Sequence, residues 1–156
     1  MGNGSDDLQK HISDFIVAVH GFLARNDVLE HRRSGIAMPK AFDMEDFRRW
    51  AREYVGTLDP AVAAWHEPLE TNAAAILELT SDARLTEPVR KLRLLIEQNV
   101  AANRMVYAEA ENAADLIDAV KLAAKALKTL GVESQTRLVH IRTALQELKT
   151  VVETPR

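Results

Sequence analysis

The 156-residue chain has no cysteine, few aromatic residues and no long apolar run. Without cysteine it has no disulfide framework, no thiolate nucleophile and no cysteine-based metal site. No apolar run approaches the roughly 18 residues that a membrane-spanning helix needs, and the first residues lack the basic and apolar regions of a signal peptide. We therefore expect a cytoplasmic protein that does not insert into a membrane.

An excess of charge of one sign is also missing. The 20 lysines and arginines nearly balance the 23 aspartates and glutamates, which gives a formal net charge of −3. These charges are interspersed, as is typical of solvated helix faces. The one locally basic stretch, HRRSGIAMPK at residues 31–40, has no interleaved aromatic residues, so we expect no nucleic-acid partner.

The chain lacks the residue spacings that metal and cofactor sites require. A di-iron bundle site needs Glu-x-x-His on two helices, and none of the five histidines has a glutamate three positions before it. No glycine-rich phosphate loop follows a strand. His20 is a candidate phosphotransfer residue, but the apolar Ile16 and Leu23 on the same helix edge favour an ordinary boundary histidine. We expect no metal, no cofactor and no enzymatic activity.

Helical periodicity covers nearly the whole chain. Apolar residues recur three and four positions apart, and no segment shows the alternation of a strand. The stripes are Leu8, Ile12, Phe15, Val19 and Phe22; Phe47, Trp50, Ala51 and Tyr54; Val62, Trp65, Leu69, Ala73 and Ile76; and Leu138, Ile141, Leu145, Leu148 and Val152. The pattern predicts one all-α domain over residues 1–156, an elongated bundle of four to five helices.

Caps and helix breakers set the expected limits of these helices. Residues 26–42 contain a glycine and a proline and are predicted to form a connector. Asp43 is the expected cap of the next helix, with Phe42 and Phe47 as a hydrophobic staple, and Gly56 follows its end. Pro68 lies inside the third stripe and predicts a kink or break just before it.

The fourth helical segment is the longest. It is predicted to run from about residue 87 to 130, after a cap at Thr86, and to end at Gly131. At 1.5 Å per residue it would be roughly 66 Å long, whereas a compact domain of this size is only about 40 Å across. We therefore expect either an elongated bundle or a helix that projects toward a partner. A separate amphipathic helix is expected within residues 133–156.

Two amides interrupt the apolar stripe of this long segment. Its 4-3 spacing runs through Leu92, Ile96, Asn99, Asn103, Val106, Ala110, Ala113, Ile117, Val120, Ala124 and Leu127. Asparagines in a helix seam fix the register of packed helices at some expense of stability, and small residues allow close approach. The facing helix can belong to the same bundle, to a second copy of the chain or to a partner protein.

The same segment resembles a known family. LRLLIEQNVAANRMVYAEAENAADLIDAVKLA, residues 92–123, is similar to the C-terminal helix of FlgN-type flagellar export chaperones, within a match over about residues 88–128. The similarity rests on Leu92, Leu95, Glu97, Gln98, Asn99, Asn103 and Val106. Members of that family are small, cytoplasmic bacterial proteins that bind amphipathic C-terminal helices of hook-associated proteins before export. The resemblance implies a non-enzymatic chaperone of the flagellar type III system.

A client helix lying along this seam would use anchors at i, i+3 and i+7. The amides would set its register, and the apolar residues would supply contact area. The expected partner-binding residues are Asn99, Asn103, Met105, Val106, Tyr107, Ile117 and Val120. The alternative is a structural or regulatory bundle that forms a homodimer through the same seam.

Overall fold

The computed structural model describes residues 3–35, 43–56 and 58–153, and within these ranges it contains helices and no strand. The prediction of an all-α helical bundle is confirmed. The helices are α1 (Asn3–Gly35), α2 (Met44–Gly56), α3 (Leu58–Leu79), α4 (Ala83–Arg104), α5 (Ala108–Glu111) and α6 (Leu116–Glu153).

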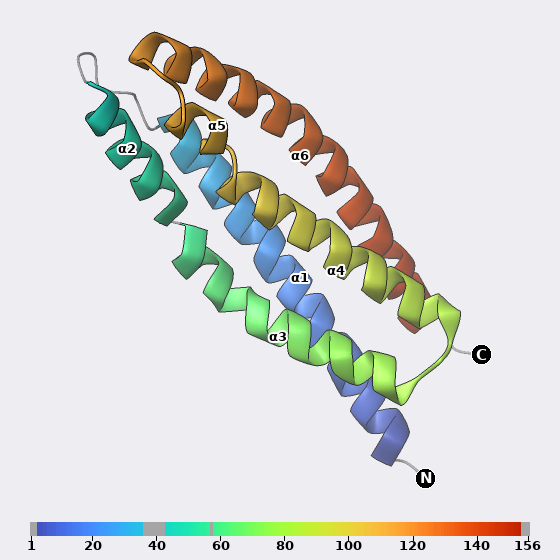
Figure 1. Ribbon diagram of the computed structural model, residues 1–156. Coiled ribbons are helices and arrows are strands. Elements are labelled where there is room, and N and C mark those ends of the chain that lie inside the picture. Colours follow the sequence, from blue (N-terminus) through green and yellow to red (C-terminus); the bar gives the residue numbers. More distant parts are fainter. Residues whose placement is uncertain (1–2, 36–42, 57, 154–156) are drawn as a thin grey trace.

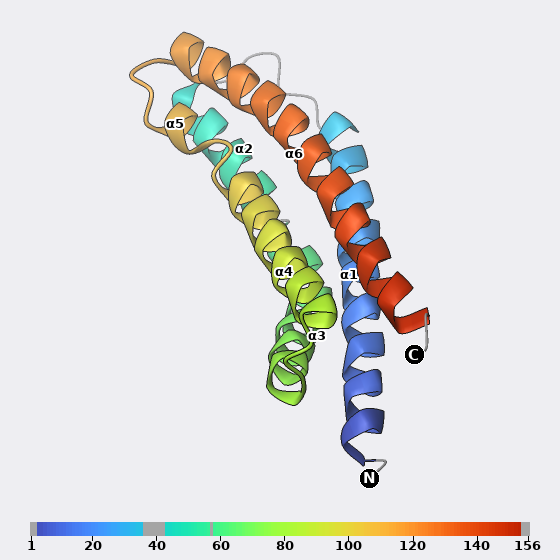
Figure 2. The same cartoon turned by 90° about the vertical axis from the view of Figure 1, so that its right-hand side faces the viewer.

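The helices form an elongated, antiparallel bundle (Figure 1). Its four rods are α1, the successive helices α2 and α3, α4 followed by the short α5, and α6. Both ends of the chain lie at the same end of the bundle, and α2 and α5 lie at the other. The view turned by 90° shows α4 running alongside α6 (Figure 2). The main packing pairs are α1 with α3 and α4 with α6.

The larger of two hydrophobic cores occupies the half of the bundle that carries the termini. Its buried residues are Ile12, Phe15, Ala18, Val19, Phe22, Trp65, Leu69, Ala73, Ile76, Val89, Leu92, Ile96, Leu138, Ile141, Ala144, Leu145 and Leu148. The rings of Phe22 and Trp65 pack edge to face, with centroids 5.1 Å apart. Gly21 permits this close contact between α1 and α3, since a Cβ there would lie 3.3 Å from the Trp65 Cβ. The apolar stripes predicted for the first and last helices line this core, as does the third stripe from Trp65 to Ile76.

The smaller core lies at the other end of the bundle. Its buried residues are Phe47, Ala51, Tyr54, Val106, Tyr107, Ala110, Ala119, Ala123 and Leu130. Tyr107 packs against α2, with ring centroids 5.0 Å from Trp50 and 5.2 Å from Tyr54. The stripe predicted for the second helix therefore faces the centre of this core. The small alanines on α6 allow that helix to approach closely.

The limits of α1 and α2 correct one prediction and confirm another. The connector does not begin at residue 26, because α1 continues to Gly35; a helix can continue where its apolar stripe fades if no glycine or proline interrupts it. Asp43 caps α2 as predicted: its Oδ1 accepts a hydrogen bond from the Asp46 amide at 2.9 Å, and Asp46 Oδ2 accepts one from the Asp43 amide at 3.3 Å. Phe42, the predicted staple residue, lies outside the described residues.

The predicted cap of α4 is wrong, and one of the two outcomes predicted at Pro68 does not occur. Of the kink or break expected there, the break is absent, because α3 is continuous from Leu58 to Leu79. The carbonyl that loses its partner to this proline belongs to Ala64, which is exposed and can bind water. The cap of α4 is Asp82, whose Oδ1 accepts from the Arg84 amide at 3.1 Å. Thr86, the predicted cap, is buried inside the helix.

The predicted unbroken helix over residues 87–130 is also wrong. α4 ends at Arg104, residues 105–107 and 112–115 are not helical, and α6 then runs back along α4. The bundle does contain one very long helix, but it is α6, with 38 residues. The expected separate helix within residues 133–156 is its second half. Gly131 does not end a helix, because α6 passes through it without a positive φ.

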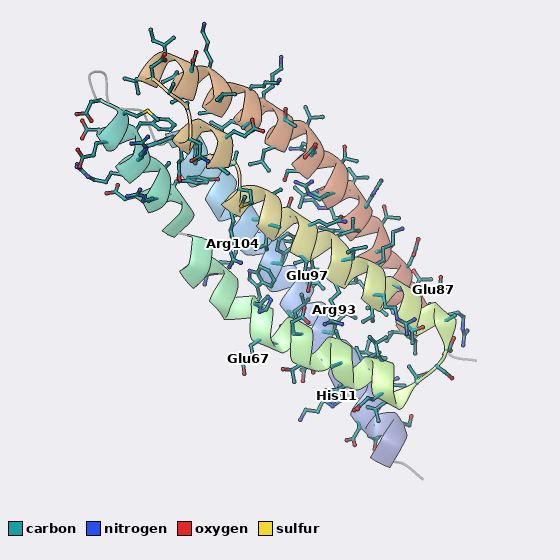
Figure 3. The ribbon with its side chains drawn as sticks, viewed as in Figure 1. His11, Glu67, Glu87, Arg93, Glu97 and Arg104 are labelled. Carbon is teal, nitrogen blue, oxygen red and sulfur yellow. The ribbon has the colours of Figure 1, made fainter. Side chains whose placement is uncertain are left out.

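An ion pair joins α3 to α4 in the larger core's wall. Arg93 Nε donates to Glu70 Oε2 at 2.8 Å, and Arg93 lies with Glu97 on the side of α4 that faces α3 (Figure 3). The hydrogen bond from Arg93 lowers the pKa of Glu70 below its ordinary value of 4.5. The ionised carboxylate is therefore favoured by folding.

Gly131→Ala tests whether α6 is continuous. Nothing lies within 4 Å of a Cβ placed at Gly131, so alanine should raise the free energy of unfolding by about 0.5–1 kcal/mol through its helix propensity. Chemical denaturation measures this change. A loss of stability would instead indicate a left-handed glycine at a helix end, which alanine tolerates poorly.

Acid denaturation tests the Glu70–Arg93 pair. Because the pKa of Glu70 is lowered by folding, its contribution is fully present above about pH 4.5 and is lost as the pH falls through the folded-state value. Glu70→Gln should lower the free energy of unfolding at pH 7 by up to about 1 kcal/mol and make it less dependent on pH below 4.5. Glu78→Gln, at an exposed position of α3, is the control; an equal effect of both substitutions on the pH dependence would contradict the assignment.

Candidate functional site

A layer of buried and half-buried polar residues separates the two hydrophobic cores. We call it the amide layer; its members are Asn26, Asn99, Asn103, Ser134 and Arg137. Asn99 and Ser134 are each 1% exposed, and Asn26 and Asn103 are also buried. The residues come from α1, α4 and α6, so the layer links three of the four rods of the bundle.

Asn99 holds this layer together. Its Nδ2 donates a hydrogen bond to Asn26 Oδ1 at 3.2 Å, and its Oδ1 accepts one from Arg137 Nε at 2.9 Å. One side chain on α4 is thereby bonded to α1 on one side and to α6 on the other. An amide can both donate and accept, so it satisfies these two different partners at once.

Asn103, one turn further along α4, extends the layer toward α2. Its Nδ2 donates to the backbone carbonyl of Asn99 at 2.8 Å, and its Oδ1 lies 3.5 Å from the Tyr54 hydroxyl. The first is a short hydrogen bond and the second is at the outer limit for one. Asn103 is therefore held mainly by its own helix and contacts the smaller core through Tyr54.

The hydrogen bonding of the layer is incomplete among the described side chains. Asn26 Nδ2, Ser134 Oγ and Arg137 Nη2 are buried without a hydrogen-bond partner there. Arg137 Nη1 lies 3.7 Å from Glu133 Oε2, a long ion-pair distance. Buried polar atoms without partners cost about 1–3 kcal/mol each, so the layer specifies how the helices align rather than adding stability.

The seven residues predicted to bind a partner do not form one surface. Asn99 and Asn103 are buried in the amide layer, and Val106 and Tyr107 are buried in the smaller core. The helix that faces the amides is α6 of the same chain. The prediction that Asn99, Asn103 and Tyr107 are exposed to a client helix is therefore wrong in this structure, whereas Val106, which is 6% exposed, lines the groove described below.

The other three predicted residues lie elsewhere. Met105 is 65% exposed at the end of α4, Ile117 is 69% exposed at the start of α6, and Val120 is half-buried. The helix breaks explain the scatter: the non-helical residues shift the register, so α6 buries Ala119 and Ala123 in place of Ile117. The 4-3 seam predicted for a continuous helix is therefore not one stripe.

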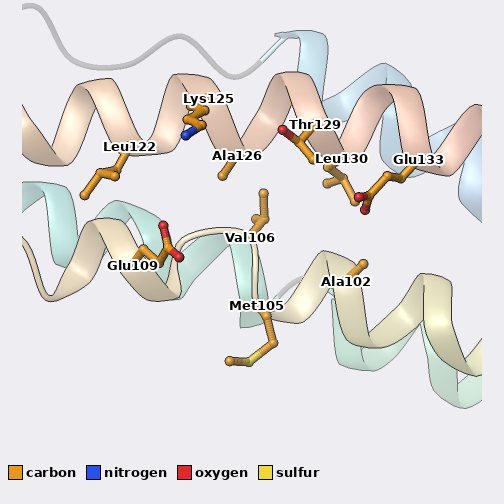
Figure 4. Close-up of a pocket in the computed structure, with 10 residues that line it drawn as sticks. All are labelled: Ala102, Met105, Val106, Glu109, Leu122, Lys125, Ala126, Thr129, Leu130 and Glu133. Atoms are coloured by element: carbon orange, nitrogen blue, oxygen red, sulfur yellow. The ribbon is translucent and has the colours of Figure 1, made fainter.

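A groove adjoins the amide layer on the side of the smaller core. It has a volume of about 400 Å³ and lies between the end of α4, the connection to α5, and α6 (Figure 4). Its lining residues are Ala102, Met105, Val106, Glu109, Leu122, Lys125, Ala126, Thr129, Leu130 and Glu133. We call it the α4–α6 groove.

The α6 wall of the groove is an apolar row with helical spacing. On α6, Leu122, Ala126 and Leu130 are four residues apart, and Val106 points toward them from the opposite wall (Figure 4). Charges of both signs, such as Glu109 and Lys125, stand around this apolar floor. The arrangement suits the packing of side chains from a helix, because ridges with the same spacing can enter such rows.

We find no candidate metal site or membrane-spanning helix in the described residues. A cleft of about 200 Å³ between α3 and α4 is lined in part by His66, Glu97 and Arg104, but no group of three or more metal-ligating side chains occurs in the described ranges. His20 is exposed on α1 rather than at a boundary. None of the described helices is both long and apolar enough to cross a membrane.

Three important residues were missed by the reading of the sequence. Asn26 fell in the predicted connector, and Arg137 lies in what was expected to be a separate helix. Asp115 caps α6, with its Oδ1 accepting from the Asp118 amide at 2.9 Å. The Asp-x-x-Asp pattern at 115–118 is a helix-start signal, and it marks the reversal of the chain.

Asn99→Ala tests the amide layer. The substitution removes two hydrogen bonds and leaves Asn26 and Arg137 without their shared partner, so we expect a loss of about 2–3 kcal/mol in the free energy of unfolding. Gln98→Ala, at the exposed neighbouring position, should change it by less than about 0.5 kcal/mol. Urea denaturation of the two variants measures the difference; equal stabilities would show that Asn99 does not act as described.

Comparison with known proteins identifies no relative of this chain. No protein-family model, no curated protein and no solved structure matches the chain.

Proposed function

We propose that the protein is a non-enzymatic module that binds an amphipathic helix of another protein in the α4–α6 groove. The observation that carries the proposal is the apolar row of Leu122, Ala126 and Leu130 on α6, which Val106 faces across the groove. A helix-in-groove complex uses anchors at i, i+3, i+4 and i+7, and side chains at that spacing can pack between the residues of this row, which lie four apart.

The composition of the groove favours a helix over a small molecule. Its floor contains two alanines, Ala102 and Ala126, which allow a guest backbone to come close. Met105 is largely exposed at its edge, and methionine adapts readily to different partners. Glu109, Glu133 and Lys125 around the floor can pair with charges beside the apolar stripe of the guest.

The resemblance of residues 88–128 to FlgN-type chaperones gives the proposal a specific client. We take the guest to be the C-terminal amphipathic helix of a hook-associated protein, held in the cytoplasm before flagellar export. The groove residues Ala102, Met105 and Val106 lie within the segment that carries the resemblance. Asn99 and Asn103 have an internal role in this proposal, because they align α4 with α1 and α6.

The alternative function, homodimerisation through the α4 seam, has lost the surface on which it was based. The chain's own α6 covers Asn99 and packs along α4. A second copy would have to displace α6 and leave the larger core without one of its four walls. A dimer that keeps the bundle intact must use another face.

Binding of synthetic peptides tests the proposal. A peptide with the C-terminal sequence of a hook-associated protein should gain helicity on mixing and shift the NMR signals of Met105, Ala126 and Leu130. The Met105→Glu, Lys125→Glu double variant should weaken binding about tenfold or more, which corresponds to 1.4 kcal/mol or more. Isothermal calorimetry measures the affinity, and both positions are exposed, so the fold should persist.

Leu94→Glu is the matched control. Leu94 is 55% exposed on α4 and lies outside the groove, so its substitution should leave peptide affinity unchanged. If the groove variant binds as tightly as the unmodified protein, the site is wrong. If no such peptide binds at all, the chaperone proposal is wrong.

A further inference from the structure

The outer face of α6 carries a second stripe with heptad spacing. We call it the outer seam; its members are Val132, Thr136, Val139, Thr143, Gln146 and Thr150, which alternate four and three residues apart. All six are exposed. They lie two positions before the buried stripe Ser134, Leu138, Ile141, Leu145 and Leu148, and two residues turn a helix by about 200°, so the stripes are on opposite faces.

The outer seam is less polar than its residue types suggest. Val132 and Val139 are 66% and 57% exposed. The threonine hydroxyls turn back to their own helix: Thr143 Oγ1 donates to the Val139 carbonyl at 2.9 Å, and the other two threonines of the seam do the same to Val132 and Gln146 at 3.3 and 2.8 Å. Each hydroxyl hydrogen is therefore used within the helix, so these threonines need no outside acceptor.

Charged residues flank the outer seam with the two signs separated. On one side Glu133, His140 and Glu147 directly follow Val132, Val139 and Gln146. On the other side Gln135, Arg142 and Lys149 directly precede the three threonines, and Lys128 lies one heptad before Gln135. In a two-stranded coiled coil, such flanking positions of one helix pair with those of the other and set its partner and direction. The positions of the charged residues can therefore be compared with the pairs that a parallel and an antiparallel arrangement of two α6 helices would form.

We propose that two copies of this chain pack outer seam to outer seam, with their α6 helices parallel. In the parallel arrangement each flanking residue meets the opposite flank five positions further along the other copy, so Lys128 faces a second-copy Glu133 and Arg142 faces a second-copy Glu147. An antiparallel pair would place basic flank against basic flank and acidic against acidic. The charges on the two sides of the outer seam are thus complementary between two copies only when the α6 helices are parallel.

The geometry of the bundle permits this symmetric contact. α6 forms one side of the bundle, and its inner face is covered by α1 and α4 (Figure 2). Val132 to Thr150 spans about 27 Å of helix. A parallel pair has a two-fold axis along the seam, so the same patch serves both copies, as a closed homodimer requires. The interface uses neither Met105 nor the alanines of the α4–α6 groove, although Glu133 borders both surfaces.

Sedimentation equilibrium of the full chain tests the dimer. The unmodified protein should show a reversible monomer–dimer equilibrium at micromolar concentration. Arg142→Glu creates two like-charge pairs across the interface and should raise the dissociation constant about tenfold or more. Arg142→Glu combined with Glu147→Arg exchanges the signs and should restore dimerisation to within about threefold of the original.

A second pair of variants distinguishes the interface from a folding defect. Val139→Glu should abolish the dimer, whereas Thr143→Val should lower the dissociation constant, because valine is more apolar; both positions are exposed. A protein that stays monomeric at every concentration, a dimer that survives Val139→Glu, or a charge exchange that fails to restore association would each overturn the proposal. Val139 and Thr143 lie outside the α4–α6 groove, so peptide binding can be measured on these variants independently of this outcome.

Discussion

The structure depends on one buried amide. Asn99 donates to Asn26 on α1 and accepts from Arg137 on α6, so it fixes the position of α4 along both neighbours at once. Sliding either helix by one turn would place this amide against apolar side chains and cost about 1–3 kcal/mol for each unpaired group. Apolar contacts are far less selective, since similar side chains can exchange places. The large hydrophobic core supplies most of the stability, and the amide layer selects one alignment of the helices.

The amide layer also explains why the bundle has two cores. On the side of the termini, large residues such as Ile96 and Ile141 fill the space between four helices. On the other side, the alanines of α6 meet the aromatic residues of α2 around Tyr107. The chain turns at residues 105–115, beside the smaller core to which Val106, Tyr107 and Ala110 belong, instead of continuing as one helix of roughly 66 Å. The turn lets α6 cover the apolar stripe of α4, and the α4–α6 groove lies where the helical wall is interrupted.

Periodicity predicted much of the fold and little of the site. The stripes from Ile12 to Phe22 and from Leu138 to Leu148 lie in the core as expected, because a helix buries a face whatever its neighbours are. The end of α4 contains no glycine or proline, so tertiary packing rather than a local helix breaker ends the helix there. The only local signal in the sequence is the cap at Asp115, which marks the start of α6. The partners of Asn99 are 73 and 38 residues away in sequence. A local sequence pattern cannot identify partners this far apart. The two amides on the apolar stripe indicated only that a polar group must face them.

The chain reversal between α4 and α6 is the central claim, and a single distance tests it. The protein has no cysteine, so cysteines introduced at the exposed positions Gln98 and Lys128 are the only sites for two spin labels. An unbroken helix would hold these positions about 45 Å apart. The hairpin places them on two packed helices, whose axes lie about 8–10 Å apart. A pulsed electron spin resonance measurement should give one distance distribution well below 30 Å, allowing for the length of the labels. A distribution centred near 45 Å would contradict the structure, because α6 could then not cover Asn99.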